Sequence, residues 1–385
     1  MKILITTDWY EPVINGVVTS VLNLVKELTA KGHDVRILTL SYGAHSYYSQ
    51  GVYYIASISI GGIYPDARAT LYAGRKMVDS IIRWHPDIIH SQCEFSSFQY
   101  AKQISRKLNI PIVHTYHTLY ESYTHYFSPS KKMGKHIVSG LSRNLLSRVQ
   151  SIIAPSEKIK RVLYSYRILR RIYVVPSGID LNKFNVTLLP SERRALLGEL
   201  SIPEGNKILI TVGRLAKEKN VEQLIQYFHK MNRSDTDFII VGGGPYQKVL
   251  MEYAEKIGAN KNIHFTGMVM PQFVAKYYQL GDIFLCGSTS EAQGLTYMEA
   301  MASGLPCVCH KDTCLNGIVI DGKNGYQYDT YENFEKYINS ILDNPELKES
   351  MSKNAKEITE NQFSTKAFAE KIEKIYEKEI KRYIQ

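Results

Sequence analysis

Residues 2–7 read K-I-L-I-T-T, residues 15–33 read N-G-V-V-T-S-V-L-N-L-V-K-E-L-T-A-K-G-H, and residues 34–40 read D-V-R-I-L-T-L. The first and third segments are short and apolar, which is typical of buried strands. The middle segment repeats apolar residues at helical spacing (Leu22, Val25, Leu28) and ends at Gly32, a common helix stop. The order strand, turn, helix, strand predicts the start of a mostly parallel sheet.

The same alternation continues along the chain. Helices are expected near 70–84, 97–108 and 131–148 and after residue 156, with short apolar strands between them. A second series starts at residue 207 with K-I-L-I-T-V-G-R, after a Pro- and Gly-containing stretch at 182–206 that we interpret as a linker. We therefore predict an α/β protein with two Rossmann-like domains, at 1–185 and 186–363, and a helix at 364–385 crossing back to the first domain.

Composition bounds the class of protein. The chain has 385 residues, of which 44% are hydrophobic and 22% charged, so a disordered or fibrous protein is excluded. No apolar run reaches the roughly 18–20 residues of a spanning helix, and the N-terminus does not resemble a signal peptide. Five cysteines make an odd number that suits a reducing compartment. We expect a cytoplasmic location.

Positive charge is concentrated in the first half. Residues 1–185 hold 23 Lys+Arg against 11 Asp+Glu, whereas the formal charge of the whole chain is +10. This asymmetry indicates a nucleic acid, an anionic membrane surface or an acidic substrate as a partner, and a plain excess of surface lysine remains an alternative.

The second domain contains the most informative segment, E-A-Q-G-L-T-Y-M-E-A-M-A-S-G-L-P at 291–306. It reads as a turn entering a helix, so the backbone amides of Gly294, Leu295 and Thr296 are available to a diphosphate. Glu299 follows about one turn into the helix, where a carboxylate can accept from a ribose diol. Glu291 precedes the turn and can bind sugar hydroxyls. Two exposed structural glutamates are the alternative.

Two cations follow the strand that opens the second domain. In V-G-R-L-A-K-E-K-N at 212–220, Arg214 and Lys219 occupy a strand-to-helix loop, where they can neutralise a leaving diphosphate. A solvated loop of mixed charge is the alternative, because Lys217 and Glu218 lie between them.

These segments together resemble the retaining glycosyltransferases of family four, which have the GT-B fold of two Rossmann-like domains facing across a cleft. The resemblance runs nearly end to end, through N-G-V, P-D-I-I-H, H-T-Y-H-T, S-I-I-A-P-S, V-P-S-G-I-D, V-G-R-L-A-K-E-K-N, V-G-G-G-P-Y and the E-x7-E segment. One departure is Ser177, where the family commonly has asparagine.

The resemblance implies a role for each matching position. Arg214 and Lys219 match the pair that grips the nucleotide diphosphate, and Glu299 matches the ribose ligand. Glu291 and the amides of Gly294 to Thr296 match the donor-sugar contacts. Gly16 matches the glycine that lets the backbone approach the diphosphate. His117 matches the histidine that reaches the transferred sugar. The family implies a nucleotide-sugar donor, here UDP-glucose, and neither a metal nor another cofactor.

Three other patterns point to different chemistry. Asp235-Thr236-Asp237 is the metal-diphosphate signature of another glycosyltransferase fold, but it precedes a strand and so lies at the wrong sheet end. Cys307, Cys309, His310 and Cys314 have zinc-like spacing, but two cysteines two apart on a buried strand are typical of small core residues. The glycines at 242–244 lack the spacing of a dinucleotide site.

The first domain is basic and aromatic around the position where the family binds its acceptor. Tyr116, Tyr120, Tyr123 and Tyr126 lie close together in sequence, followed by a basic helical segment with Lys131, Lys132 and Lys135. Helical spacing predicts that its apolar residues form one face: Ile137, Val138, Leu141, Leu145 and Val149. A basic amphipathic helix indicates a peripheral protein on the inner face of the cell membrane. A helix that packs its apolar face on the sheet is the alternative.

The segments T-D-W-Y-E-P-V-I-N-G-V-V-T-S, P-D-I-I-H-S-Q-C-E-F-S-S-F and H-T-Y-H-T-L-Y-E-S-Y-T-H-Y are similar to those of bacterial diacylglycerol glucosyltransferases. This implies a UDP-sugar, a lipid acceptor such as diacylglycerol and an α-glycolipid product. Two alternatives stay open: a capsule or cell-wall glycosyltransferase with a polyprenyl-linked acceptor, and a nucleic-acid-binding protein that uses the basic half. The second lacks any recognition motif, so no nucleic-acid partner is expected.

Overall fold

The computed structural model describes residues 1–385 except 14, 61–67, 71–72, 122–129 and 290, and the side chains of Lys131 and Lys132. The chain divides into two compact units. Unit 1 comprises Met1–Gly178 and Thr365–Gln385, and unit 2 comprises Ile179–Ser364.

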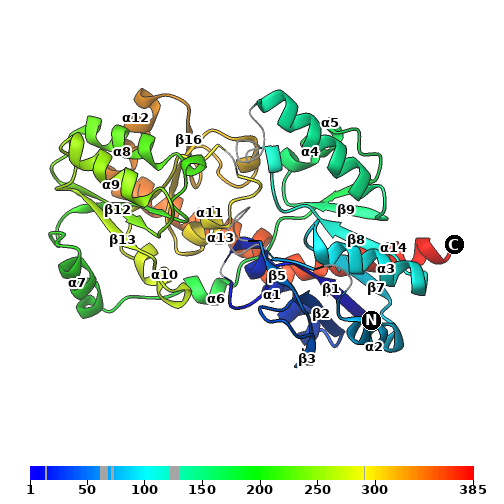
Figure 1. The fold of residues 1–385 in the computed structure, drawn as a ribbon. Helices are drawn as coiled ribbons and strands as arrows, with labels where there is room; N and C mark the ends of the chain where they lie inside the picture. The colour runs from blue at the N-terminus through cyan, green and yellow to red at the C-terminus, as the bar shows by residue number, and fades with distance from the viewer. Residues whose placement is uncertain (14, 61–67, 71–72, 122–129, 290) are drawn as a thin grey trace. The chain divides into compact units, whose positions relative to one another are not determined.

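Unit 1 is built on a mixed sheet whose described strands follow the order β10-β9-β8-β7-β1-β2-β4-β3 (Figure 1). All neighbouring strands are parallel except β3 and β4. The strands are β1 (Lys2–Thr6), β2 (Asp34–Leu40), β3 (Tyr47–Ser49), β4 (Val52–Ile55), β7 (Ile88–Ser91), β8 (Ile112–Thr115), β9 (Ser151–Ala154) and β10 (Arg171–Val174), with the separate pair β5 (Ile58–Ser59) and β6 (Arg68–Ala69).

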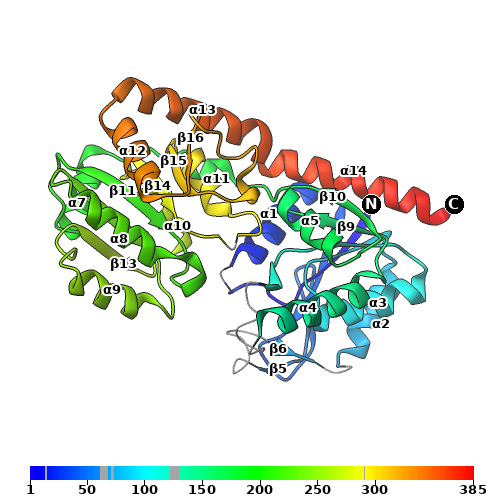
Figure 2. The same cartoon turned by 90° about the horizontal axis from the view of Figure 1, so that it is seen from above.

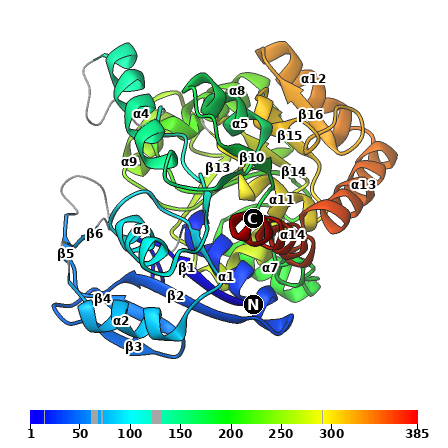
Figure 3. The same ribbon diagram turned by 90° about the vertical axis from the view of Figure 1, so that its right-hand side faces the viewer.

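Helices connect these strands as the alternation predicts. They are α1 (Gly16–Ala30), α2 (Arg75–Trp84), α3 (Ser96–Leu108), α4 (Lys131–Leu146) and α5 (Glu157–Ser165). The helix α2 lies beside the sheet edge formed by β4 and β3 (Figure 3). Asn15 caps α1, because its side-chain oxygen accepts from the amide of Val18 at 2.9 Å.

The helix α14 (Thr365–Ile384) returns to unit 1, which confirms the predicted crossing. Phe368, Ile372 and Tyr376 pack with α1 and the strands in one hydrophobic core. Tyr376 Oη also lies 2.5 Å from Nδ1 of the buried His90. The carboxylate of Glu379, only 1% exposed, accepts a hydrogen bond from Tyr173 at 2.9 Å. Such a buried charge is tolerated only with partners of this kind.

Unit 2 is a parallel sheet in the order β13-β12-β11-β14-β15-β16. Its elements are α6 (Leu181–Phe184), α7 (Pro190–Glu199), β11 (Lys207–Val212), η2 (Lys217–Lys219), α8 (Val221–Met231), β12 (Thr236–Val241), α9 (Gln247–Lys256), β13 (Ile263–Gly267), α10 (Pro271–Tyr278), β14 (Ile283–Cys286), α11 (Leu295–Ala302), β15 (Cys307–His310), η3 (Thr313–Leu315), β16 (Gly325–Tyr328), α12 (Tyr331–Leu342) and α13 (Pro345–Phe363).

Helices cover both faces of this sheet (Figure 2). Side chains alternate along a strand, so Ile208 and Ile210 of β11 join the core with α11 and α13, whereas Leu209 joins the core with α8 and α12. Burial on both faces explains the continuous apolar runs of these strands.

The stretch at 182–206, interpreted from sequence as a linker, is instead part of unit 2. Leu197 at the end of α7 and Ile202 after it are 2% and 5% exposed and lie in the core with β11. The prolines misled the prediction: Pro190 occupies the first turn of α7, where a missing N–H costs nothing.

Candidate functional site

The site residues expected in the second domain follow two neighbouring strands of unit 2. Arg214 and Lys219 follow β11, and Glu291 follows β14. The two strands pair directly, with Leu209 opposite Ile283. Carboxyl ends of adjacent parallel strands meet at one sheet edge, which is where ligands bind in such folds.

Lys219 and Glu291 are in contact there. Lys219 Nζ donates to Glu291 Oε1 over 2.5 Å, with the two side chains 31% and 12% exposed. A hydrogen bond between groups of opposite charge at this distance is stronger than one between neutral groups. The residue that the sequence analysis assigned to the diphosphate, Lys219, therefore forms an ion pair with the residue assigned to the donor sugar, Glu291.

The loop that carries Arg214 is fixed by the glycine turn after β12. Gly213 N donates to Val241 O at 3.0 Å, and Leu215 N donates to Gly243 O at 2.9 Å. Gly242 has φ +124°, and a Cβ there would collide with the carbonyl oxygen of Gly213. Gly242 and Gly244 thus allow close backbone packing, since a Cβ at Gly244 would collide with the carbonyl oxygen of Leu215.

The helix α11 begins at the predicted turn. Gly294 is its N-cap with φ +78°, and a Cβ there would collide with the Tyr297 ring. The first-turn amides of Leu295 and Thr296 have no carbonyl four residues back within the helix, so they can bind an anion. The predicted helix start at this position is confirmed.

Glu299 lies on the same helix and is held by a residue that the sequence analysis missed. Tyr278, fully buried at the end of α10, donates from Oη to Glu299 Oε2 at 2.9 Å. Burial raises the pKa of Glu299, while the hydrogen bond from Tyr278 and the charge of Lys183 oppose the rise. One carboxylate oxygen is thus oriented, as a ribose ligand requires. No sequence signal marks Tyr278, because it lies on another helix, 21 residues before Glu299.

In unit 1, His117 follows β8 and lies beside Gln92, which follows β7. His117 Nε2 is 2.7 Å from Gln92 Oε1. Burial, with a contribution from His114, lowers the pKa of His117 to about 3. The imidazole is therefore neutral at pH 7, and because the amide oxygen only accepts, Nε2 carries the proton. Nδ1 then has a lone pair that can accept from a hydroxyl.

A second polar group in unit 1 was also missed. Asp8, which follows β1, is 7% exposed and accepts from the amide of Ser97 at 2.8 Å. Burial, aided by the nearby charge of Glu94, raises the pKa of Asp8 to about 7. Glu94 Oε2 accepts from Tyr120 Oη at 2.5 Å, and Glu94 Oε1 lies 3.3 Å from His114 Nε2. The sequence signal for Asp8 and Glu94 was their position shortly after β1 and β7.

The basic helical segment forms α4, and the predicted apolar face is only partly buried. Val138 and Val149 are buried, whereas Ile137 and Leu141 are 42% and 60% exposed. Successive residues differ by 100° around a helix, so this apolar arc is wider than the buried side. Ile137 and Leu141 thus lie on the exposed side of this arc.

Of the three lysines expected to face the membrane, the structure describes the side chain of Lys135. Lys135 is 54% exposed and lies 3.3 Å from Glu121. Tyr126 and Tyr123 lie outside the described residues, as do the side chains of Lys131 and Lys132.

Two further positions singled out from the sequence, Gly16 and Ser177, lie in unit 1. Gly16 is the first residue of α1. Ser177 binds within unit 1, where the Ser20 hydroxyl donates to its oxygen at 3.0 Å.

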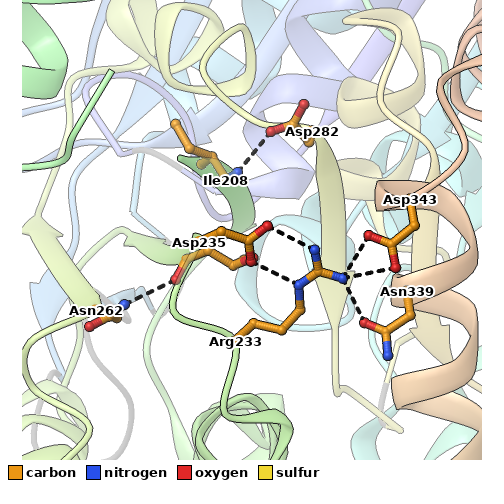
Figure 4. A network of polar contacts seen from close by, with 8 residues as sticks. Ile208, Arg233, Asp235, Asn262, Asp282, Asn339 and Asp343 are labelled. Carbon is orange, nitrogen blue, oxygen red and sulfur yellow. Dashed lines mark hydrogen bonds and ion pairs between the residues drawn. The ribbon is translucent and has the colours of Figure 1, made fainter. Parts of the chain in front are cut away.

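The two metal-like patterns have structural explanations. Asp235 and Asp237 lie at the start of β12, as expected, and Asp235 pairs with Arg233 at 2.9 Å (Figure 4). Cys307 and Cys309 are fully buried in unit 2. Within the described part of the chain, no group of three His, Cys, Asp or Glu could hold a metal ion.

Hydropathy adds one finding about membranes. Among the described helices, none is both long and apolar enough to span a bilayer.

Comparisons with known proteins show the family of this chain. Residues 14–183 match the family model described as Glycosyltransferase Family 4, and residues 192–358 match that of Glycosyl transferases group 1. The chain is 32% identical to the alpha-monoglucosyldiacylglycerol synthase of Streptococcus pneumoniae, over 94% of this chain and 83% of that protein. It is also 32% identical to the enzyme of the same name from Acholeplasma laidlawii, over 98% and 96%.

The fold is also similar to solved structures. A crystal structure of Anabaena HepE in complex with UDP and glucose has a TM-score of 0.76 at 19% identity, covering 98% of this chain and all of that one. Sucrose-phosphate synthase from Thermosynechococcus elongatus has a TM-score of 0.75 at 19% identity, covering 98% of each chain.

Proposed function

Because the chain belongs to the family-four glycosyltransferases and has their GT-B fold, we propose that it transfers glucose from UDP-glucose to diacylglycerol, forming an α-glycolipid. The names of its two relatives at 32% identity support the glycolipid product. The observation that carries the donor half is the Lys219–Glu291 pair beside the start of α11 at one sheet edge of unit 2.

The donor is held by charge and by backbone amides. Arg214 and Lys219 bind the diphosphate, together with the amides of Leu295 and Thr296 at the start of α11. Glu299, oriented by Tyr278, accepts from the ribose hydroxyls. Glu291 and the amides after Gly294 contact the glucose hydroxyls.

The first domain contributes two residues to the same reaction. Gly16 allows the backbone to approach the diphosphate. His117 accepts a hydrogen bond at Nδ1 from a hydroxyl of the transferred sugar, because its Nε2 donates its proton to the side-chain oxygen of Gln92.

The proposed chemistry retains the anomeric configuration without a metal or other cofactor. The bond between C1 of glucose and the diphosphate oxygen breaks first, giving an oxocarbenium–diphosphate ion pair. The acceptor hydroxyl attacks C1 from the same face, and its proton passes to the departing phosphate oxygen. Negative charge grows on the diphosphate during this step, so Arg214 and Lys219 act mainly in the transition state.

The acceptor half rests on α4. Its Met133, Ile137 and Leu141 are 49%, 42% and 60% exposed and are spaced four residues apart, so they form a row along the helix. An apolar row on a basic helix is the arrangement by which peripheral proteins bind anionic membranes. We propose that the protein lies on the inner face of the cell membrane by this helix.

One assay tests the proposal. Purified protein is incubated with labelled UDP-glucose and vesicles that contain either diacylglycerol or an undecaprenyl-linked sugar, with and without EDTA. We expect label only in glucosyl-diacylglycerol, cleavable by an α-glucosidase and insensitive to EDTA. Transfer only to the undecaprenyl acceptor would overturn the lipid assignment, a β-linked product would overturn retention, and EDTA inhibition would overturn metal independence.

A further inference from the structure

Unit 1 contains a hollow of about 320 Å³ outside the site described above. It lies between α3 and α4. Its lining residues are Gln99, Lys102 and Arg106 from α3, Leu141, Asn144 and Leu145 from α4, and Arg148 shortly after α4.

The hollow carries uncompensated positive charge. Three of its lining residues are cations, Lys102, Arg106 and Arg148, and no lining residue is acidic. In the part of the chain that the structure describes, no carboxylate forms an ion pair with any of the three. Partial burial and repulsion by Arg106 and Arg148 lower the pKa of Lys102. A bound anion would relieve this repulsion.

Ordinary structural roles account for only part of this arrangement. Arg106 lies in the last turn of α3, where a cation is favoured by the helix dipole. Lys102 Nζ lies 5.3 Å from the centre of the Phe98 ring, a weak cation–π contact. Neither role requires Arg148, which follows α4, to line the same hollow.

The α4 side of the hollow contains two leucines, Leu141 and Leu145. Leu141 lines it and is also the last residue of the exposed row Met133, Ile137 and Leu141 on α4. Residues four apart lie one above another on a helix, so the row leads along α4 to the three cations. An anionic head beside an apolar track matches the two ends of a phospholipid.

We propose that this hollow binds the phosphate of an anionic phospholipid, with the acyl chains lying along the exposed row of α4. The phosphate oxygens accept hydrogen bonds from Lys102, Arg106 and Arg148. The side-chain amides of Gln99 and Asn144 are available to the glycerol head group. This inference rests on the proposed membrane-bound function and deepens it, because it replaces diffuse surface attraction by one saturable site.

The probe is dihexanoylphosphatidylglycerol below its micellar concentration, with binding followed by calorimetry. Dihexanoylphosphatidylcholine and inorganic phosphate are the comparison ligands. The test variant is Lys102→Gln/Arg106→Gln/Arg148→Gln. The control is Lys371→Gln/Lys374→Gln/Lys378→Gln on α14, which removes the same charge from exposed positions of the same unit.

We expect saturable binding of the phosphatidylglycerol, weakened about 10²-fold in the test variant and little changed in the control, since each cation contributes about 1 kcal/mol. Leu141→Ser should weaken the phosphatidylglycerol several-fold and leave inorganic phosphate unchanged. Equal losses in the two triple variants would overturn the site. Binding of inorganic phosphate without the lipid would also overturn it, in favour of a plain phosphate site.

Activity separates this inference from the proposed function. The test variant should still glucosylate diacylglycerol in detergent and lose activity only in anionic vesicles. If the native protein glucosylates diacylglycerol but binds no phosphatidylglycerol, the hollow is excluded and the proposed function stands. If it binds phosphatidylglycerol but never glucosylates diacylglycerol, the acceptor is wrong and the lipid site stands.

Discussion

In unit 2, the carboxyl ends of β11 and β14 carry an ion pair, Lys219 with Glu291. In unit 1, the carboxyl ends of β1 and β8 are followed by Asp8, whose pKa is raised to about 7, and by His117, whose pKa is lowered to about 3. One sheet edge thus pairs an acidic with a basic side chain, whereas at the other edge burial favours the neutral forms of Asp8 and His117. The difference matches the proposed partition of substrates, since a diphosphate needs charge and hydroxyl groups need neutral hydrogen-bond partners.

The largest effect is expected at the charged edge. Lys219→Ala removes a cation from the diphosphate and leaves Glu291 unpaired, so the rate of glucose transfer should fall about 10²–10³-fold. Lys217→Ala, an exposed cation in the same short helix, is the control and should change the rate little. The measurement is single-turnover transfer at saturating donor. Similar losses in both variants would mean that the loop acts only through its total charge.

The neutral edge is tested through stability. The folded pKa of Asp8, about 7, lies above the usual aspartate value of 3.8, so the native state binds more protons than the unfolded state and stability falls as pH rises through this window. Between pH 5 and pH 8 the loss due to Asp8 is about 2.7 kcal/mol, or two pKa units.

Asp8→Asn should remove that loss while its side-chain oxygen still accepts from Ser97. Urea unfolding of both proteins at pH 5 and pH 8 measures the difference. A native protein and a variant with parallel pH dependence would show that Asp8 is ionised throughout, and the contrast between the two edges would fail.

Donor affinity provides the next test. Glu299→Ala removes the charged acceptor proposed for the ribose diol, so UDP binding should weaken by about 1.5–3 kcal/mol. Calorimetric titration with UDP measures this, and the unfolding midpoint serves as a check on the fold. An unchanged dissociation constant would remove Glu299 from the site.

The smallest effect is expected at the residue that orients Glu299. Tyr278→Phe removes only one hydroxyl from the core, and we expect UDP affinity to fall by about 1 kcal/mol with the rate at saturating donor nearly unchanged. Tyr277→Phe, on the adjacent and partly buried tyrosine, is the matched control. A loss of stability without a change in affinity would make Tyr278 a core residue and nothing more.

Much of this organisation could be predicted from sequence, because short apolar runs and intervening helical patterns determine a parallel sheet. The turn at Gly294 and the position of Glu299 on α11 were predictable, since they are local features. The pairing of Lys219 with Glu291 was not, because it depends on β11 and β14 being neighbours in the sheet. Tyr278 and Asp8 were missed for a similar reason: their partners, Glu299 and Ser97, come from other elements.

The return of α14 to unit 1 has a consequence for how the chain is made. Unit 1 needs Phe368, Ile372 and Tyr376 to complete one of its cores, and these residues are synthesised after all of unit 2. On the ribosome, unit 2 can finish folding first, while residues 1–178 wait with an apolar face uncovered. Exposed apolar surface of this kind favours aggregation, so we expect the first half of the chain to be prone to aggregation until its last helix emerges.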